Sequence, residues 1–188
     1  FDSNDTVSLS DTATNLSGAT MSANLDGVDA TDNGAYTVSA AESALAFDSN
    51  DTVTLSDTAT NIGSSTIGTT VDTVNATDNG AYAVSTTELG TISRFDSNDT
   101  VTISDTATNI IGATMSGQNV DSVDASDNGA YTVSVAESSL SFDSNDTVTV
   151  SDTATNISGA TMTGNIDTVD ATDNGAYSVS ISEAGYTF

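Results

Sequence analysis

The chain contains no cysteine, histidine, proline, lysine or tryptophan, and its one basic residue is Arg94. The absence of cysteine excludes a disulfide framework and thiol chemistry. Without histidine, cysteine or lysine, the chain lacks the usual general bases, nucleophiles and Schiff-base formers. Paired carboxylates could serve glycoside hydrolysis, but carboxylates copied in every repeat indicate architecture, since one active site needs one special place. We therefore expect that the protein is not an enzyme.

Acidic residues dominate the charge, with 27 Asp and Glu and a net charge of −26. Nucleic-acid binding depends on Lys and Arg contacts to phosphate, so we expect no nucleic-acid partner. An anionic membrane surface is excluded for the same reason, and no apolar run approaches the about 18 residues of a membrane span. The low content of large aliphatic residues would normally indicate disorder. However, the apolar positions keep one register through the whole chain, which indicates a folded protein.

A unit that begins Phe-Asp-Ser-Asn-Asp-Thr-Val defines the domain organisation. It begins at Phe1, Phe47, Phe95 and Phe142, and Phe188 begins a fifth copy, so the steps are 46, 48, 47 and 46 residues. Self-similarity at such a period is the signature of a repeat array, in which each unit contacts its neighbours. The domains we expect are repeats 1–46, 47–94, 95–141 and 142–188. We expect this sequence to be part of a longer array that continues into further repeats or associates end to end.

Short segments of alternating polar and apolar residues predict strands. Residues 52–56 alternate in this way, which is the two-residue period of a strand with one buried face. A second strand around Val74 and Ala76 ends at Asp-Asn-Gly, which predicts a tight turn because Asn and Gly tolerate positive φ. Asp57-Thr58 is a turn signal. The segment 40–45 is compatible with one helical turn or a loop.

The strand centres recur about every 23 residues, which is the length of one coil of a parallel β-solenoid with about three short strands. We therefore expect an all-β fold: a parallel β-solenoid of about eight coils, two per 47-residue repeat, forming one continuous structure about 40 Å long at about 4.8 Å per layer. The strand centres should then form one column. Phe47, Phe95 and Phe142 should stack on one another, as should the Tyr residues that follow each Asp-Asn-Gly.

A Greek-key sandwich is the alternative fold. Asp-Asn-Gly-Ala-Tyr has the spacing of a tyrosine corner. A unit of about 47 residues is nevertheless too short for a sandwich domain, which takes about 100 residues. The solenoid is the favoured prediction.

The repeated acidic corners are candidate calcium sites. Calcium takes six to eight oxygen ligands from carboxylates, amides and carbonyls. Stacked coils would bring like charges together, which is unfavourable, and a divalent ion between them would convert this repulsion into a cross-link. The alternative is that these residues are turn formers and solubilising charge; Asp57 is a less favoured ligand. The candidate ligands are Asp2, Asp5, Asp29, Asp32, Asp48, Asp51, Asp78, Asp96, Asp99, Asp124, Asp127, Asp143, Asp146, Asp170 and Asp173.

Threonine pairs such as Thr52 and Thr54 suggest a second kind of function. Rows of Thr on a flat outer face could make an adhesive module that recognises polysaccharide or ice. In alternate coils, acidic or amide residues interrupt this array. The simpler explanation, that Thr is a good strand former, is favoured.

The phrase Asp-Thr-Ala-Thr-Asn-Ile at 57–62, 105–110 and 152–157, with Val-Asp-Ala-Thr-Asp-Asn and Thr-Val-Ser, resembles tandem repeats of giant secreted bacterial surface proteins. That group includes long adhesins and surface-layer or filament components, often exported by type I secretion. The resemblance covers the whole chain through short phrases. It implies an extracellular or cell-surface location and a role as shaft, spacer or matrix fibre. No site residues carry over from it.

Overall fold

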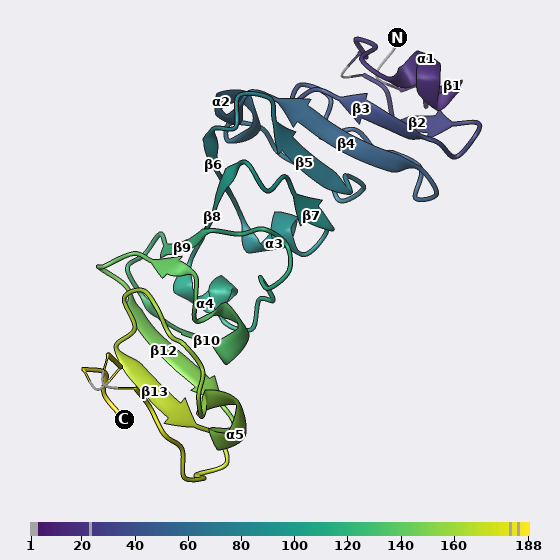
Figure 1. The fold of residues 1–188 in the computed structure, drawn as a ribbon. Helices are drawn as coiled ribbons and strands as arrows, with labels where there is room; N and C mark the ends of the chain where they lie inside the picture. Colours follow the sequence, from purple (N-terminus) through teal and green to yellow (C-terminus); the bar gives the residue numbers. More distant parts are fainter. Residues whose placement is uncertain (1–3, 23, 181, 184) are drawn as a thin grey trace. The chain divides into compact units, whose positions relative to one another are not determined.

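The computed structural model describes residues 4–22, 24–180, 182–183 and 185–188. These residues form mostly short parallel strands joined by loops and a few single helical turns (Figure 1). The chain divides into two compact units, Phe1–Ala83 with Thr87–Val101 and Val84–Thr86 with Thr102–Phe188. The prediction of a β-rich fold with parallel strands is confirmed.

The first unit contains two parallel sheets. The strands are β1 (Ser8–Asp11), β2 (Gly27–Ala30), β3 (Ala35–Val38), β4 (Thr52–Asp57), β5 (Thr73–Ala76) and β7 (Arg94–Phe95). β1 pairs with β2, and the order of the other sheet is β3-β4-β5-β7, with β3, β4 and β5 side by side in Figure 1. Tyr36 lies opposite Val53, Leu55 opposite Val74, and Val74 opposite Phe95. The chain therefore makes one full loop of 17 to 21 residues between paired strands.

The second unit repeats this pattern. Its strands are β9 (Ser122–Ala125), β10 (Ala130–Val133), β11 (Ser141–Phe142), β12 (Thr147–Asp152) and β13 (Thr168–Ala171). β6 (Ala81–Val84) and β8 (Thr100–Asp105) lie across the division between the units. β9 pairs with both β8 and β11, and β12 pairs with both β10 and β13, always in parallel. The same sequence register thus gives the same pairing in both units.

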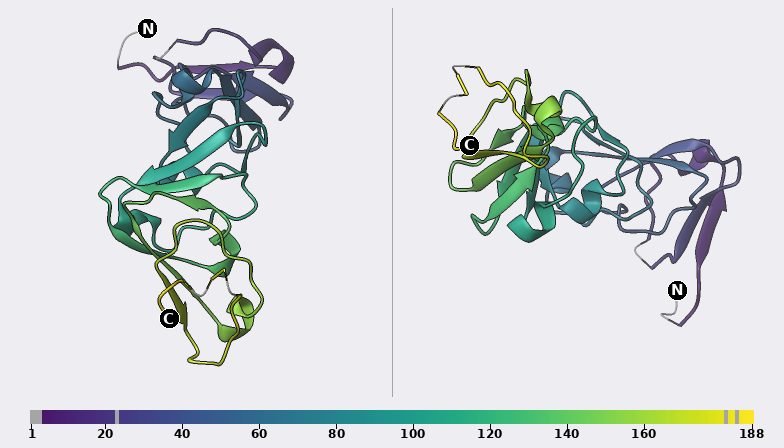
Figure 2. Two further views of the ribbon diagram at one scale, coloured as in Figure 1. Left: turned by 60° about the vertical axis from the view of Figure 1, so that its left-hand side comes forward. Right: turned by 90° about the horizontal axis from the view of Figure 1, so that it is seen from below.

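Each long strand is followed by a helical turn that the sequence analysis did not predict as a helix. These turns are α1 (Ala13–Leu16), α2 (Ala59–Ile62), α4 (Ala107–Ile110) and α5 (Ala154–Ile157), and isolated helical turns are visible in Figure 2. In α2, Ala59 and Ile62 are buried while the turn begins at Thr58, whose hydroxyl accepts from the Asn61 N–H. One turn of helix is stabilised by such caps and by the buried face.

The segment 40–45, left open between one helical turn and a loop, forms turns without a helix. The equivalent segments of the next two repeats are helical turns: α3 (Thr86–Leu89) and a 3-10 turn, η1 (Val135–Glu137). No helix in the described ranges is long and apolar enough to cross a membrane.

The Asp-Asn-Gly segments form the predicted tight turns. The three that lie between described strands connect strands of different sheets and make no hairpins. Asn79 has φ 49° and Asn128 has φ 51°, which is the left-handed region that Asn tolerates. The following glycine is required for another reason. A Cβ on Gly129 would lie 2.6 Å from the Cβ of Ala107, so the corner packs directly on α4.

The prediction of one continuous column of strands was wrong. Val28 lies opposite Leu9 and Phe47, whereas Val53 lies opposite Tyr36, so the strands form separate sheets. The Phe that begins a repeat takes the place beside Val28 that was expected for Val53. The corner after this Phe then leads the chain into another sheet.

The predicted stacking of like aromatic rings was also wrong, although their burial is confirmed. Tyr131 and Phe142 are 2% and 5% exposed, and their ring centroids lie 6.2 Å apart in an edge-on arrangement. Tyr36 and Phe47 form an equivalent pair at 6.0 Å. In the described part of the chain, aromatic contacts thus join the Tyr of one repeat to the Phe that opens the next.

Candidate metal sites

The corner Phe-Asp-Ser-Asn-Asp is held by its own hydrogen bonds and by the strand beside it. The Asp48 N–H donates to the carbonyl of Val28 at 2.9 Å, and the Asp51 N–H donates to the carbonyl of Asp48 at 3.1 Å. The Asp48 carboxylate accepts from the Asn50 N–H at 2.9 Å. These contacts place Asp51, which is only 6% exposed, beneath the corner.

One oxygen of Asp51 is satisfied and the other is not. Its Oδ2 accepts from the N–H of Ala30 at 2.9 Å and from the Tyr36 hydroxyl at 3.3 Å. Its Oδ1 is buried and has no hydrogen-bond partner. A buried acceptor without a partner is costly and needs an explanation such as an ion or water.

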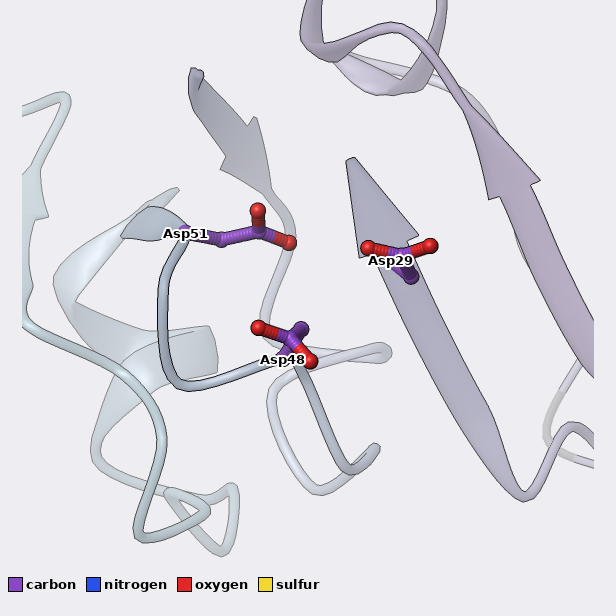
Figure 3. A group of neighbouring side chains, drawn as sticks. All are labelled: Asp29, Asp48 and Asp51. Carbon is purple, nitrogen blue, oxygen red and sulfur yellow. The ribbon is translucent and has the colours of Figure 1, made fainter. Parts of the chain in front are cut away.

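The carboxylates of Asp29, Asp48 and Asp51 converge on this corner. One oxygen from each lies within 4.8 Å of the others, an arrangement that can hold a metal ion. Figure 3 shows Asp29 on β2 facing Asp48 and Asp51 on the loop before β4. All three were predicted as ligands.

The second unit contains an equivalent group of Asp124, Asp143 and Asp146, again within 4.8 Å. The Asp146 Oδ2 accepts from the Ala125 N–H at 2.8 Å and from the Tyr131 hydroxyl at 3.2 Å, while its Oδ1 is buried without a partner. Burial raises the pKa of Asp146, and the charges of Asp124 and Asp143 add to this rise. Both causes oppose ionisation of Asp146 in the folded protein.

A third copy of this corner carries an amide in place of one carboxylate. Asp99 accepts from the Ala76 N–H at 2.7 Å and from the Tyr82 hydroxyl at 3.2 Å, and its Oδ1 is also buried without a partner. Burial raises the pKa of Asp99, with a further contribution from Asp96. Asn75 occupies the strand position that Asp29 and Asp124 occupy in the other copies.

The tyrosine hydroxyls lie inside the same electrostatic environment. Burial raises the pKa of Tyr36, and the nearby charges of Asp51, Asp29 and Asp48 raise it further. Tyr131 behaves in the same way beside its own three aspartates. Each hydroxyl therefore remains protonated and donates to the buried carboxylate.

The predicted aspartates of the Asp-Asn-Gly corners do not belong to these groups. Each accepts a hydrogen bond from the first N–H of a helical turn, as Asp78 does from Ala59 at 2.9 Å. Asp32, Asp127 and Asp173 do the same at 2.9 to 3.0 Å. These carboxylates therefore cap the short helices from the neighbouring loop of chain.

The remaining predicted ligands lie at the two ends. Asp2 lies outside the described residues, and Asp5 is exposed. Asp170 has the same strand position as Asp29 and Asp124, and its carboxylate accepts from the Ser151 hydroxyl at 3.4 Å.

Other acidic residues also act on the backbone, which the sequence analysis did not predict. Glu42 is 6% exposed and accepts from the Met21 N–H at 3.1 Å and from the Ser39 N–H and hydroxyl. Asp105 accepts from Thr86 and Asn109 side chains at 2.6 and 2.7 Å; although burial opposes them, these bonds lower its pKa to about 2. The Ser-x-x-Glu spacing of a capping box was the available signal for Glu42.

No family model, curated protein or solved structure matches this chain. The chemistry of the site therefore rests on the residues themselves. The two groups offer oxygen donors from carboxylates, and the chain has neither histidine nor cysteine to supply nitrogen or sulfur ligands. Such a donor set suits a hard divalent cation.

Proposed function

We propose that this chain is a structural repeat segment of a giant extracellular bacterial surface or filament protein. It acts as a shaft, spacer or matrix fibre, and calcium stabilises it. The observation that carries this proposal is the repetition itself: one set of backbone contacts by carboxylates recurs in every repeat at steps of 46 to 49 residues. An array built by copying favours a mechanical or spacing role over a single binding site.

We further propose that the chain winds as a parallel β-solenoid of about eight coils, with two coils per repeat. Paired strands in both units are separated by one loop of 17 to 21 residues, and they are always parallel. Continuous winding of the chain produces this pattern directly. In this form of solenoid, the last strand of one repeat pairs with the first long strand of the next, as β3 does with β4 and β10 with β12. The Tyr–Phe pairs also join one repeat to the next.

Calcium is the cation that this proposal favours. With two groups of three aspartates and a net charge of −26, the metal-free chain has strong internal repulsion. Extracellular calcium sites commonly bind in the millimolar range, and binding to the folded state alone adds about 2.7 kcal/mol per site at a hundredfold excess over Kd.

Electron microscopy of the intact protein in its native assembly tests the proposed role. We expect long fibres of uniform width that contain this repeat. Isolated short domains, each attached to a ligand surface, would contradict the shaft and favour an adhesive module instead.

A further inference from the structure

Three junctions between consecutive repeats share one backbone arrangement. At each junction, the Phe that begins a repeat lies opposite a Val of the preceding repeat. The next Asp donates its N–H to the carbonyl of that Val at 2.9, 3.0 and 3.1 Å in the three copies. The residue after this Val is Asp29 at the first junction, Asn75 at the second and Asp124 at the third. The three junctions therefore offer a natural comparison of an aspartate with an asparagine at one position.

A second, independent feature marks each junction as a place for a cation. Asp51, Asp99 and Asp146 are each 6% exposed, and each has a buried Oδ1 without a hydrogen-bond partner. In the first and third junctions, this aspartate also belongs to the group whose oxygens lie within 4.8 Å of one another. A cation placed there could contact the Oδ1 atom that has no hydrogen-bond partner.

We propose that one calcium ion closes the first junction and one closes the third, and that the second junction is a weaker site because it carries Asn75. This inference rests on the proposed calcium-stabilised shaft and assigns where the ions act. Asp29 belongs to the first repeat, whereas Asp48 and Asp51 belong to the second. Each ion would therefore join two repeats rather than stabilise one repeat internally.

The geometry suits calcium. Calcium–oxygen distances are about 2.3–2.6 Å, so two ligands on opposite sides of one ion lie about 4.6–5.2 Å apart. The three oxygens of each group lie within 4.8 Å of one another, which is close enough for one calcium ion to contact all three. Shallow surface depressions lined by Asp29, Asp48 and Phe47, and by Asp124 and Asp143 with Phe142, give water and ions access to both groups. Water can complete the coordination shell.

The three junctions differ in the number of charged ligands, and we therefore expect them to differ in calcium affinity. The first and third present three carboxylates, and the second presents two carboxylates and one amide. Because ligand charge tunes calcium affinity, we expect the second site to bind about tenfold more weakly. Without metal, the second junction also has less repulsion between its ligands, because it carries two carboxylates instead of three. Loss of calcium should therefore loosen the first and third junctions and leave the second the least affected.

Titration of the 188-residue chain with Ca²⁺ alone by calorimetry tests this assignment, with Tb³⁺ as a second probe. Tyr36 and Tyr131 donate to the clustered carboxylates and, without tryptophan, are the nearby sensitisers of terbium luminescence. We expect two tight ions for the natural sequence. Asn75→Asp should raise the count to three, and Asp29→Asn should lower it to one.

A matched control is Asp78→Asn, which changes an aspartate of the second repeat that caps Ala59 and lies outside the groups. It should leave two tight ions. Circular dichroism checks that each variant is folded. If Asp29→Asn does not fold, the rise from two to three tight ions expected for Asn75→Asp still tests the proposal. A count that neither substitution at the junctions changes would overturn the proposal.

The outcomes also separate this inference from the proposed function. Fibres formed by a chain that binds no tight calcium would overturn the junction sites and leave the shaft intact. Two tight ions on a protein that occurs as isolated short domains would leave the junction sites intact and overturn the shaft.

Discussion

Replacing Asp146 with Asn should stabilise the metal-free third junction, which holds Asp124, Asp143 and Asp146, and abolish the response of that junction to calcium. One oxygen of Asp146 accepts hydrogen bonds from the Ala125 N–H and the Tyr131 hydroxyl. Its other oxygen is buried without a hydrogen-bond partner. The side-chain carbonyl of an asparagine can still accept the hydrogen bonds from Ala125 and Tyr131. Its NH₂ group takes the place of the second oxygen and can donate to Asp124 or Asp143. The substitution thus replaces repulsion by a hydrogen bond, and it removes a metal ligand.

Coulomb's law gives the size of the effect. At the 4.8 Å limit of the group, two unit charges repel by about 3.5 kcal/mol at an effective dielectric constant of about 20, and by about 0.9 kcal/mol in water. The substitution removes two such repulsions. Because Asp124 and Asp143 are half-buried at the surface, each repulsion lies nearer the lower value. We expect the local free energy of unfolding of the metal-free protein to rise by about 2 kcal/mol.

Hydrogen exchange read by mass spectrometry over β9 and β12 is the suitable assay, because repeat arrays open locally rather than all at once. In chelator, Asp146→Asn should exchange more slowly than the natural sequence; in millimolar calcium, the natural sequence should be the better protected. Asp127→Asn is the control, since Asp127 caps Ala107 outside the group and should respond equally in both buffers. Faster exchange of Asp146→Asn in chelator, or a full calcium response, would refute the reasoning.

Three further substitutions or conditions test the fold. Gly129→Ala should destabilise its corner by about 1–3 kcal/mol in urea unfolding, because the new Cβ meets Ala107 at 2.6 Å; Gly185→Ala, which meets nothing within 4 Å, should be neutral. Phe95→Ala removes a fully buried ring and should cost about 3–5 kcal/mol, with exchange rising first in β5 and β7. The pKa of Asp105 is lowered from 3.8 to about 2, so its contribution to stability is present above pH 3.8 and should be lost as the pH falls toward 2 in an acid titration followed by circular dichroism. Unchanged stability across that interval would contradict the role given to its hydrogen bonds.

The sequence predicted the strands and the corners well because both depend on local patterns. The alternation around Val53 and Leu55 put both side chains in the core, where neither is exposed. The Asn-Gly dipeptide predicted positive φ, which Asn79 adopts. Asp29 and Asp51 were both among the candidate calcium ligands predicted from oxygen chemistry, and they lie in one acidic group.

The strand partners could not be predicted in the same way. Alternation determines which face of Val53 is buried, but it carries no information on whether Val28 or Tyr36 lies beside it. A four-residue helix such as α2 is too short to show helical periodicity. The burial of Glu42 could not be predicted either, because it depends on the N–H of Met21, 21 residues away, which donates to its carboxylate.

The length that each repeat adds to the molecule tests the central claim, that the repeats wind into one continuous shaft. Arrays of four, eight and twelve repeats can be measured by small-angle X-ray scattering in calcium. Two strand layers per repeat at about 4.8 Å each predict an increase of about 10 Å per repeat, linear in repeat number. An increase of about 25 Å per repeat, the diameter of a separate globule of this size, would contradict the account.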